Sequence, residues 1–124
     1  MQDPVRWLAF SCAHAPLQDE EAVQSLIETI VDYKPDLIID LGDTHEADSA
    51  SRWPSEYIWS LEEEYESTDN LRRQIRLAAA LSKTPTKMVW LPGNHDRNLI
   101  AIARIDKKIR SLVHWKNWEQ EFKF

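Results

Sequence analysis

Three short stretches of the chain carry side chains that can bind metal ions or move protons. They read FSCAH at residues 10–14, DLGD at residues 40–43 and LPGNHD at residues 91–96. Imidazole nitrogens suit zinc and iron, while carboxylate and amide oxygens suit manganese and magnesium. Asp43 has two carboxylate oxygens and can bridge two ions, and Asn94 can bind an ion without adding negative charge. The combination indicates chemistry at a divalent metal centre.

Each of these stretches follows an apolar run that is typical of a β-strand. The runs span residues 5–10, 37–41 and 87–91, and polar side chains begin where each run ends. The chain contains only two glycines, and both lie at these strand ends, Gly42 after the second run and Gly93 after the third. Glycine at such a place permits a sharp turn and a close approach of two backbones.

Helices are predicted between the strands. One begins after Asp19, carries an apolar stripe at helical spacing and ends before Pro35. The next begins at Ser60, which forms a capping box with Glu63, and a third follows Asp96 and turns Leu99 inward. Residues 46–59 between the second strand and the second helix read as an inserted loop.

The alternation of strands and helices predicts an α/β fold with a parallel sheet and right-handed crossovers. In such sheets the functional residues gather beyond the carboxyl ends of the strands. We therefore expect the three polar stretches to meet at one edge of the sheet.

Length and composition describe one globular domain. The chain has 124 residues, of which 43% are hydrophobic and 29% charged. It has no apolar run of the ~20 residues that a membrane span needs and no signal-peptide pattern. Its single cysteine, Cys12, excludes an internal disulfide framework and favours a reducing, cytoplasmic location.

Charge is distributed unevenly. Residues 1–96 hold 8 Lys+Arg and 18 Asp+Glu, a balance of −10, whereas residues 97–124 hold 7 and 3, a balance of +4. The basic end can contact nucleic acid, although an ordinary solvated helix face explains it more simply. The acidic group at 62–64 and 66 is expected to be a solvated first turn of a helix.

The motifs FSCAH, DLGD and LPGNHD resemble, in order and strand context, those of the calcineurin-like metallophosphoesterases. The similarity covers residues 5 to about 100. It implies half of that family's α/β sandwich and a site with two divalent ions, manganese, iron or zinc. By this resemblance His14 would bind the first ion, Asp43 would bridge the pair and Asn94 would bind the second ion. His95 would contact the phosphate, and Asp96 would hold the His95 ring.

Two departures from the family pattern stand out. Cys12 occupies the place of the first aspartate, where its thiolate is either a softer metal ligand or a small buried side chain without that role. The family's later Gly-His-x-His motif is not found after Asp96, and the only later histidine is His114. We therefore expect residues 1–124 to be one incomplete domain, whose site a further C-terminal segment or another chain completes.

Two polar residues near the second motif have no clear place in this scheme. His45 can reach substrate but is expected to be a solvated loop histidine, and Asp40 is expected to turn to solvent at the strand end.

The first hypothesis is a hydrolase that cleaves phosphomonoesters or phosphodiesters through a water activated by two metal ions. A second is a non-enzymatic remnant of the fold that acts as a binding module, and a third is a nucleic-acid-processing nuclease aided by the basic end. The expected partner is a phosphate ester, with no membrane partner.

Overall fold

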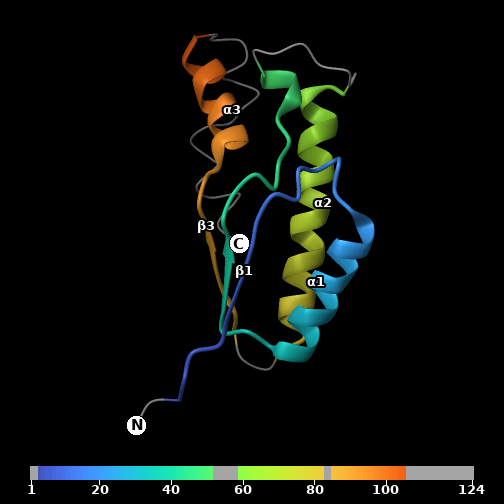
Figure 1. Ribbon diagram of the computed structural model, residues 1–124, viewed down its shortest axis with the longest axis vertical. Helices are drawn as coiled ribbons and strands as arrows, with labels where there is room; N and C mark the ends of the chain where they lie inside the picture. Colours follow the sequence, from blue (N-terminus) through green and yellow to red (C-terminus); the bar gives the residue numbers. More distant parts are fainter. Residues whose placement is uncertain (1–2, 52–58, 83–84, 106–124) are drawn as a thin grey trace.

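The core of the molecule is a three-stranded parallel sheet with helices, as expected for an α/β fold (Figure 1). The computed structural model describes residues 3–51, 59–82 and 85–105. The strands are β1 (Trp7–Phe10), β2 (Leu37–Asp40) and β3 (Lys87–Trp90), and β2 lies between the other two. Both pairs of strands are parallel, so all three carboxyl ends lie at the same edge of the sheet.

The first two predicted helices are confirmed. α1 (Glu20–Tyr33) begins after Asp19, whose Oδ1 accepts a hydrogen bond from the Ala22 main-chain nitrogen at 2.9 Å. α2 (Leu61–Ala80) begins with the capping box, in which Ser60 and Glu63 each satisfy a main-chain N–H of the other. These bonds satisfy amide groups that a helix start leaves without an intrahelical partner.

The third helix begins earlier than predicted. α3 (Asn94–Ile105) starts immediately after Gly93 rather than beyond Asp96. The Asp96 carboxylate accepts a hydrogen bond from the Gly93 main-chain nitrogen at 2.7 Å, which is the way a residue in the first turn caps a helix start. Asn94 and His95, the candidate site residues of the third motif, therefore belong to the first turn of a helix. The expected inserted loop contains one short 3-10 helix, η1 (Asp48–Ala50), and its residues 52–58 lie outside the described residues.

Helices α1 and α2 pack side by side over one face of the sheet (Figure 1). The side chains between them form one hydrophobic cluster, whose buried members are Ala15, Val23, Ile30, Ile38, Leu71, Ile75, Ala78 and Ala79. A second, smaller cluster around Ala47 and Leu99 joins η1 and α3 near the site edge, and it confirms that Leu99 faces inward. The two clusters fix the strand ends relative to α2 and α3.

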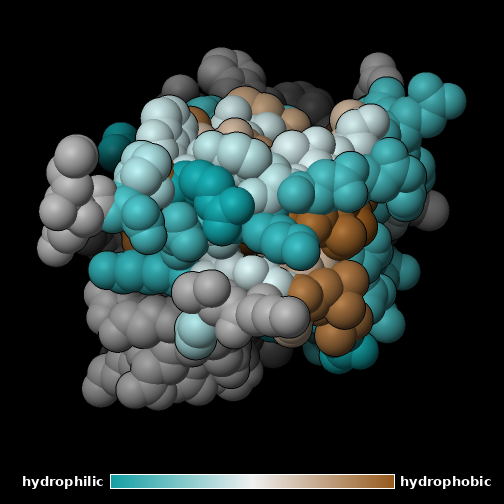
Figure 2. Space-filling view, turned by 90° about the horizontal axis from the view of Figure 1, so that it is seen from below, coloured by the Kyte–Doolittle hydropathy of each residue, from teal (hydrophilic) through white to brown (hydrophobic). Residues whose placement is uncertain are grey.

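The end of the molecule seen in Figure 2 is largely hydrophilic, with hydrophobic side chains gathered on one side. Among the described residues, no helix combines the length and apolar character needed to cross a membrane.

Candidate metal centre

The loops that follow β1 and β2 run side by side beyond the sheet. The Cys12 main-chain nitrogen donates to the Gly42 carbonyl at 3.1 Å, and that of His14 donates to the Asp43 carbonyl at 2.9 Å. An isolated parallel bridge at Ala15 continues the pairing. The hydrogen bonding of the sheet thus extends into the loops and brings the first two motifs together.

Three of the predicted site residues have a left-handed backbone. Cys12, His14 and Asp43 have φ angles of 57°, 52° and 56°. Such angles are uncommon for residues other than glycine, and they concentrate at functional sites where the surrounding structure holds them in place. Here the paired loops hold them, because the His14 main chain bonds to Asp43 and the Cys12 main chain bonds to Gly42.

The two glycines of the chain lie against each other where the second and third motifs meet. A Cβ on Gly42 would strike the Gly93 main-chain nitrogen and would lie 2.6 Å from the Leu91 carbonyl oxygen. A Cβ on Gly93 would strike the Asp43 carboxylate. Gly42 also has a φ angle of 99°, which only glycine adopts readily. The close backbone approach expected at these positions is present.

Hydrogen bonds join the third motif to Asp43. The His95 main-chain nitrogen donates to Asp43 Oδ1 at 2.9 Å, and the Asp43 nitrogen donates to Asp96 Oδ2 at 3.0 Å. The same Asp96 oxygen accepts the bond from Gly93. Asp96 is fully buried, so these two bonds clamp the turns of the second and third motifs together.

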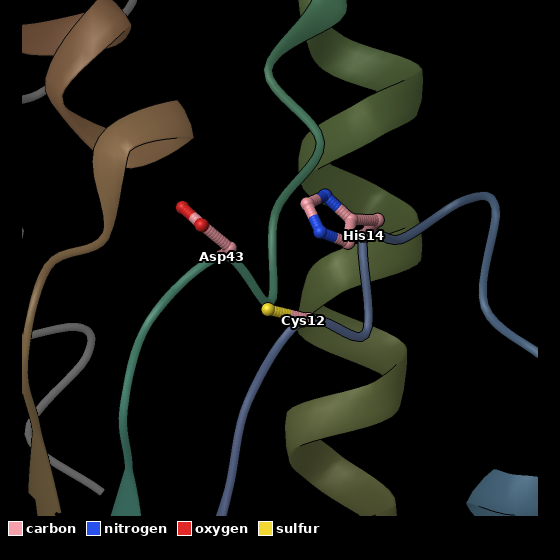
Figure 3. A group of neighbouring side chains, drawn as sticks. All are labelled: Cys12, His14 and Asp43. Atoms are coloured by element: carbon pink, nitrogen blue, oxygen red, sulfur yellow. The ribbon is translucent and has the colours of Figure 1, made fainter.

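Cys12, His14 and Asp43 form one potential metal-binding group. Their ligand atoms all lie within 4.8 Å of one another. Figure 3 shows Cys12 and His14 on the loop after β1 and Asp43 on the loop after β2. Cys12 is exposed, which excludes the alternative of a small buried side chain. A thiolate, an imidazole and a carboxylate together are a donor set suited to zinc or iron.

The ring of His95 is held by a residue that the sequence did not indicate. Its Nδ1 lies 2.6 Å from the main-chain carbonyl oxygen of Glu46, and a carbonyl can only accept, so Nδ1 carries the proton. Asp96 was expected to hold this ring, but the bonds of its carboxylate go to main-chain nitrogens of the two turns. Asn94 is exposed and is the first residue of α3.

The side chain of Glu46 also enters the site. Its Oε2 lies 2.7 Å from His14 Nδ1 and 3.7 Å from His95 Nδ1, and the two imidazole rings meet edge to face at 4.6 Å. Nothing local marks Glu46 as functional, because it reaches the site only through the pairing of the loops after β1 and β2. His14, Glu46 and His95 form a second group with ligand atoms within 4.8 Å of one another.

Comparison with protein families matches residues 5–124 to the calcineurin-like phosphoesterases. The chain belongs to this family. No curated protein and no solved structure matched the chain. The resemblance carried by the three motifs is therefore confirmed, and the parallel sheet is consistent with part of the metallophosphoesterase fold.

Asp40 supports the turn that carries Asp43 and does not point to solvent as expected. It is fully buried, and it accepts hydrogen bonds from the Gly42 nitrogen at 2.9 Å and the Thr44 hydroxyl at 2.8 Å. Arg72 of α2 lies 3.4 Å away and is also buried. Burial raises the pKa of Asp40, and the Arg72 guanidinium opposes that rise. The predicted exposure was wrong because α2 brings a cation to the strand end.

His45 is likewise buried and not a solvated loop residue. Its Nε2 lies 3.8 Å from Glu64 Oε2, too far for a hydrogen bond. Glu64, expected on a solvated helical turn, is fully buried and accepts bonds from the main chain of Asp48 and from Ser49. Burial favours a raised pKa for Glu64, but His45 and the bonds from Ser49 outweigh it and lower that pKa. Glu64 thus ties the loop that carries Glu46 to α2.

Proposed function

We propose that the chain is a metal-dependent phosphoesterase that hydrolyses phosphomonoesters or phosphodiesters by attack of water on phosphorus. Membership of the calcineurin-like family supports hydrolysis of phosphate esters. The observation that carries the proposal is the group of Cys12, His14 and Asp43 beyond the carboxyl edge of the sheet, in which Asp43 also accepts a hydrogen bond from the His95 main chain.

The donor atoms fit divalent ions. Cys12, His14 and Asp43 would hold one ion, and Asp43 together with Asn94 would hold the second. The ligand atoms of the first three residues lie within 4.8 Å of one another, and a thiolate, an imidazole and a carboxylate together suit a divalent ion. Bound zinc, iron or manganese ions supply an activated water and offset the negative charge of the phosphate.

His95 would act on the departing oxygen. The bond from Nδ1 to the Glu46 carbonyl fixes the ring and leaves Nε2 to face the substrate. Protonated at Nε2, the ring donates a hydrogen bond or a proton to the leaving group. The amino terminus of α3 adds a favourable dipole for a phosphate beside it. Asp96 contributes by fixing the turns that carry Asp43 and His95.

Further parts of the proposal extend beyond the described residues. Residues 1–124 would form one domain whose metal ligands are completed by a further C-terminal segment or by another chain. His114, the histidine that follows the third motif, lies outside the described residues. A cytoplasmic location, inferred from the single cysteine, also stays a prediction.

Hydrolysis of bis(p-nitrophenyl) phosphate with added manganese, zinc or iron tests the function. We expect Asp43→Asn and His95→Ala to lower the rate by about a hundredfold or more, since each removes a group that acts on the reaction. Asp32→Asn is the matched control, because it makes the same carboxylate-to-amide change on an exposed position of α1. Equal turnover in all variants would exclude this site. A folded chain that binds no divalent ion and hydrolyses no ester would favour the binding-module alternative.

A further inference from the structure

The group formed by His14, Glu46 and His95 has no place in the proposed hydrolytic arrangement. There, His14 is a ligand beside Cys12, and His95 is left free for the substrate. We propose that these three residues form a separate metal site that binds one divalent ion such as zinc. This site competes for His14 with the group formed by Cys12, His14 and Asp43. The metal binding stands independently of hydrolysis, and only its effect on activity rests on the proposed function.

The spacing of the three side chains suits one ion. Zinc bound tetrahedrally to nitrogen and oxygen places its ligand atoms about 3.3 Å from one another. Glu46 Oε2 lies 2.7 Å from His14 Nδ1, and one ligand atom from each of the three residues lies within 4.8 Å of the others. The two imidazole rings are already in edge contact. The three side chains are therefore gathered closely enough to share one ion.

The contact between His14 and Glu46 is better suited to a cation than to a hydrogen bond. Although the atoms are 2.7 Å apart, His14 Nδ1 makes no hydrogen bond to any described residue, so the carboxylate lies off the direction of an N–H. The nitrogen is nevertheless buried, and leaving such an atom without a partner costs free energy. A metal ion shared by the two atoms satisfies both.

His95 is prepared for the same ion. Its Nδ1–H is bonded to the Glu46 main-chain carbonyl, so the lone pair of the neutral ring resides on Nε2. Metal-binding histidines commonly donate their other N–H to a carbonyl or carboxylate in this way. The side chains of His14, Glu46 and His95 are 27%, 15% and 30% exposed, which leaves a path for an ion to enter.

The chemistry of the ligands defines the ion and the consequence. Two imidazoles and one carboxylate favour zinc, cobalt or ferrous iron over magnesium and calcium. Because His14 belongs to both groups, an ion here displaces the arrangement with Cys12 and Asp43. His95 bound to that ion has no proton to give to a leaving group. Occupancy of this site therefore produces an inactive form of the chain.

Titration of the full chain with Co²⁺, followed by absorption spectroscopy, distinguishes the two groups. Cobalt bound to a thiolate gives an intense near-ultraviolet charge-transfer band, whereas imidazole and carboxylate ligands give only visible bands. We expect visible bands that persist in Cys12→Ser. In Glu46→Gln the affinity should fall by more than about tenfold, since loss of even an outer-shell partner has that effect. Glu28→Gln, an exposed position of α1, is the matched control.

The opposite pattern would overturn the inference. In that pattern, Co²⁺ gives a charge-transfer band that disappears in Cys12→Ser, and the affinity for Co²⁺ is unchanged in Glu46→Gln. That result would leave the proposed hydrolytic centre intact. If Glu46→Gln does not fold, as judged by circular dichroism, the unmodified chain provides the test through the ring-proton resonances of its four histidines. Equimolar Zn²⁺ should shift His14 and His95 together and leave buried His45 in place. A shift of His14 without His95 would contradict the site.

Discussion

The main-chain nitrogen of Asp43 donates a hydrogen bond to the carboxylate of Asp96, 53 positions later in the sequence, at 3.0 Å. The same oxygen accepts a hydrogen bond from the Gly93 nitrogen. One buried carboxylate therefore connects the turn that carries Asp43 to the turn that carries His95. The candidate metal centre is therefore held by hydrogen bonds from main-chain nitrogens to one side-chain carboxylate, and one of these bonds crosses from the second motif to the third.

Removal of the Asp96 carboxylate is predicted to destabilise the chain through these two bonds. Asp96→Ala leaves two main-chain N–H groups without an acceptor, at a cost of about 1–3 kcal/mol each. Asp96→Asn keeps one acceptor oxygen and should cost less than half as much. Urea unfolding measures both variants, with Asp32→Asn as an exposed control. Equal losses for alanine and asparagine would show that the two hydrogen bonds do not carry the effect.

Replacement of Gly42 or Gly93, where the turns of the second and third motifs meet, is predicted to destabilise the fold strongly. Gly42→Ala places a methyl group against main-chain atoms, which cannot move aside. Gly93→Ala places one against the Asp43 main-chain nitrogen and against the Asp43 carboxylate, which a hydrogen bond from the His95 main-chain nitrogen holds in place. We expect a loss of more than about 3 kcal/mol, or no folding, from the combined strain. Ala80→Gly at the end of α2 is the reverse control and should cost only about 1 kcal/mol. A thermal midpoint that Gly93→Ala leaves unchanged would contradict the close approach.

Much of this arrangement was predictable from the sequence, because its signals are local. The apolar runs and the two N-caps, Asp19 and Ser60 with Glu63, depend on neighbouring residues and are present as predicted. The convergence of three motifs follows from the parallel topology. The two glycines were informative because a sharp turn and a close approach both require the absence of a Cβ.

The misjudged residues depend on partners from distant elements. Asp40 resembles a solvent-facing strand end, yet it is buried beside Arg72 of α2. Glu64 resembles part of a charged helical turn, yet the loop after β2 buries it through His45, Asp48 and Ser49. Glu46 was missed for the same reason. The spacing of residues within one segment cannot reveal a contact that two loops and a helix make together. The spacing of hydrophobic residues within a helix or strand does reveal which of its faces is buried.

The buried ion pair of Arg72 and Asp40 is predicted to be strongly coupled. Arg72→Met leaves the Asp40 carboxylate buried without its cation and should cost about 3–5 kcal/mol at neutral pH. Adding Asp40→Asn to that variant should restore part of the loss, because the amide carries no charge to desolvate. Urea unfolding of the two single variants and the double variant gives the coupling energy. Strictly additive losses would mean that the two groups do not stabilise each other.

Glu64 is predicted to make stability depend on acid pH. Its pKa is lowered in the folded chain, so the folded state binds fewer protons here than the unfolded state, whose reference value is 4.5. The stabilisation is present above that value and is lost as pH falls through the folded pKa. The stability difference between the unmodified chain and Glu64→Gln should therefore shrink on acidification, as followed by urea unfolding from pH 7 to pH 3. Glu28→Gln, which is exposed, is the control, and a constant difference for Glu64→Gln would exclude the linkage.

Cys12 is predicted to set the metal preference of the group with His14 and Asp43. Its thiolate favours zinc or iron, so Cys12→Asp should shift binding and ester hydrolysis toward manganese. Folding should tolerate the change, because Cys12 is exposed and aspartate accepts the left-handed backbone, with a φ of 57°, better than most residues. Cys12→Ser, which supplies neither thiolate nor carboxylate, is the matched control and should weaken zinc binding without strengthening manganese binding. If Cys12→Asp keeps the original order of metal affinities, the sulfur is not a ligand, and the preference comes from the nitrogen and oxygen donors alone.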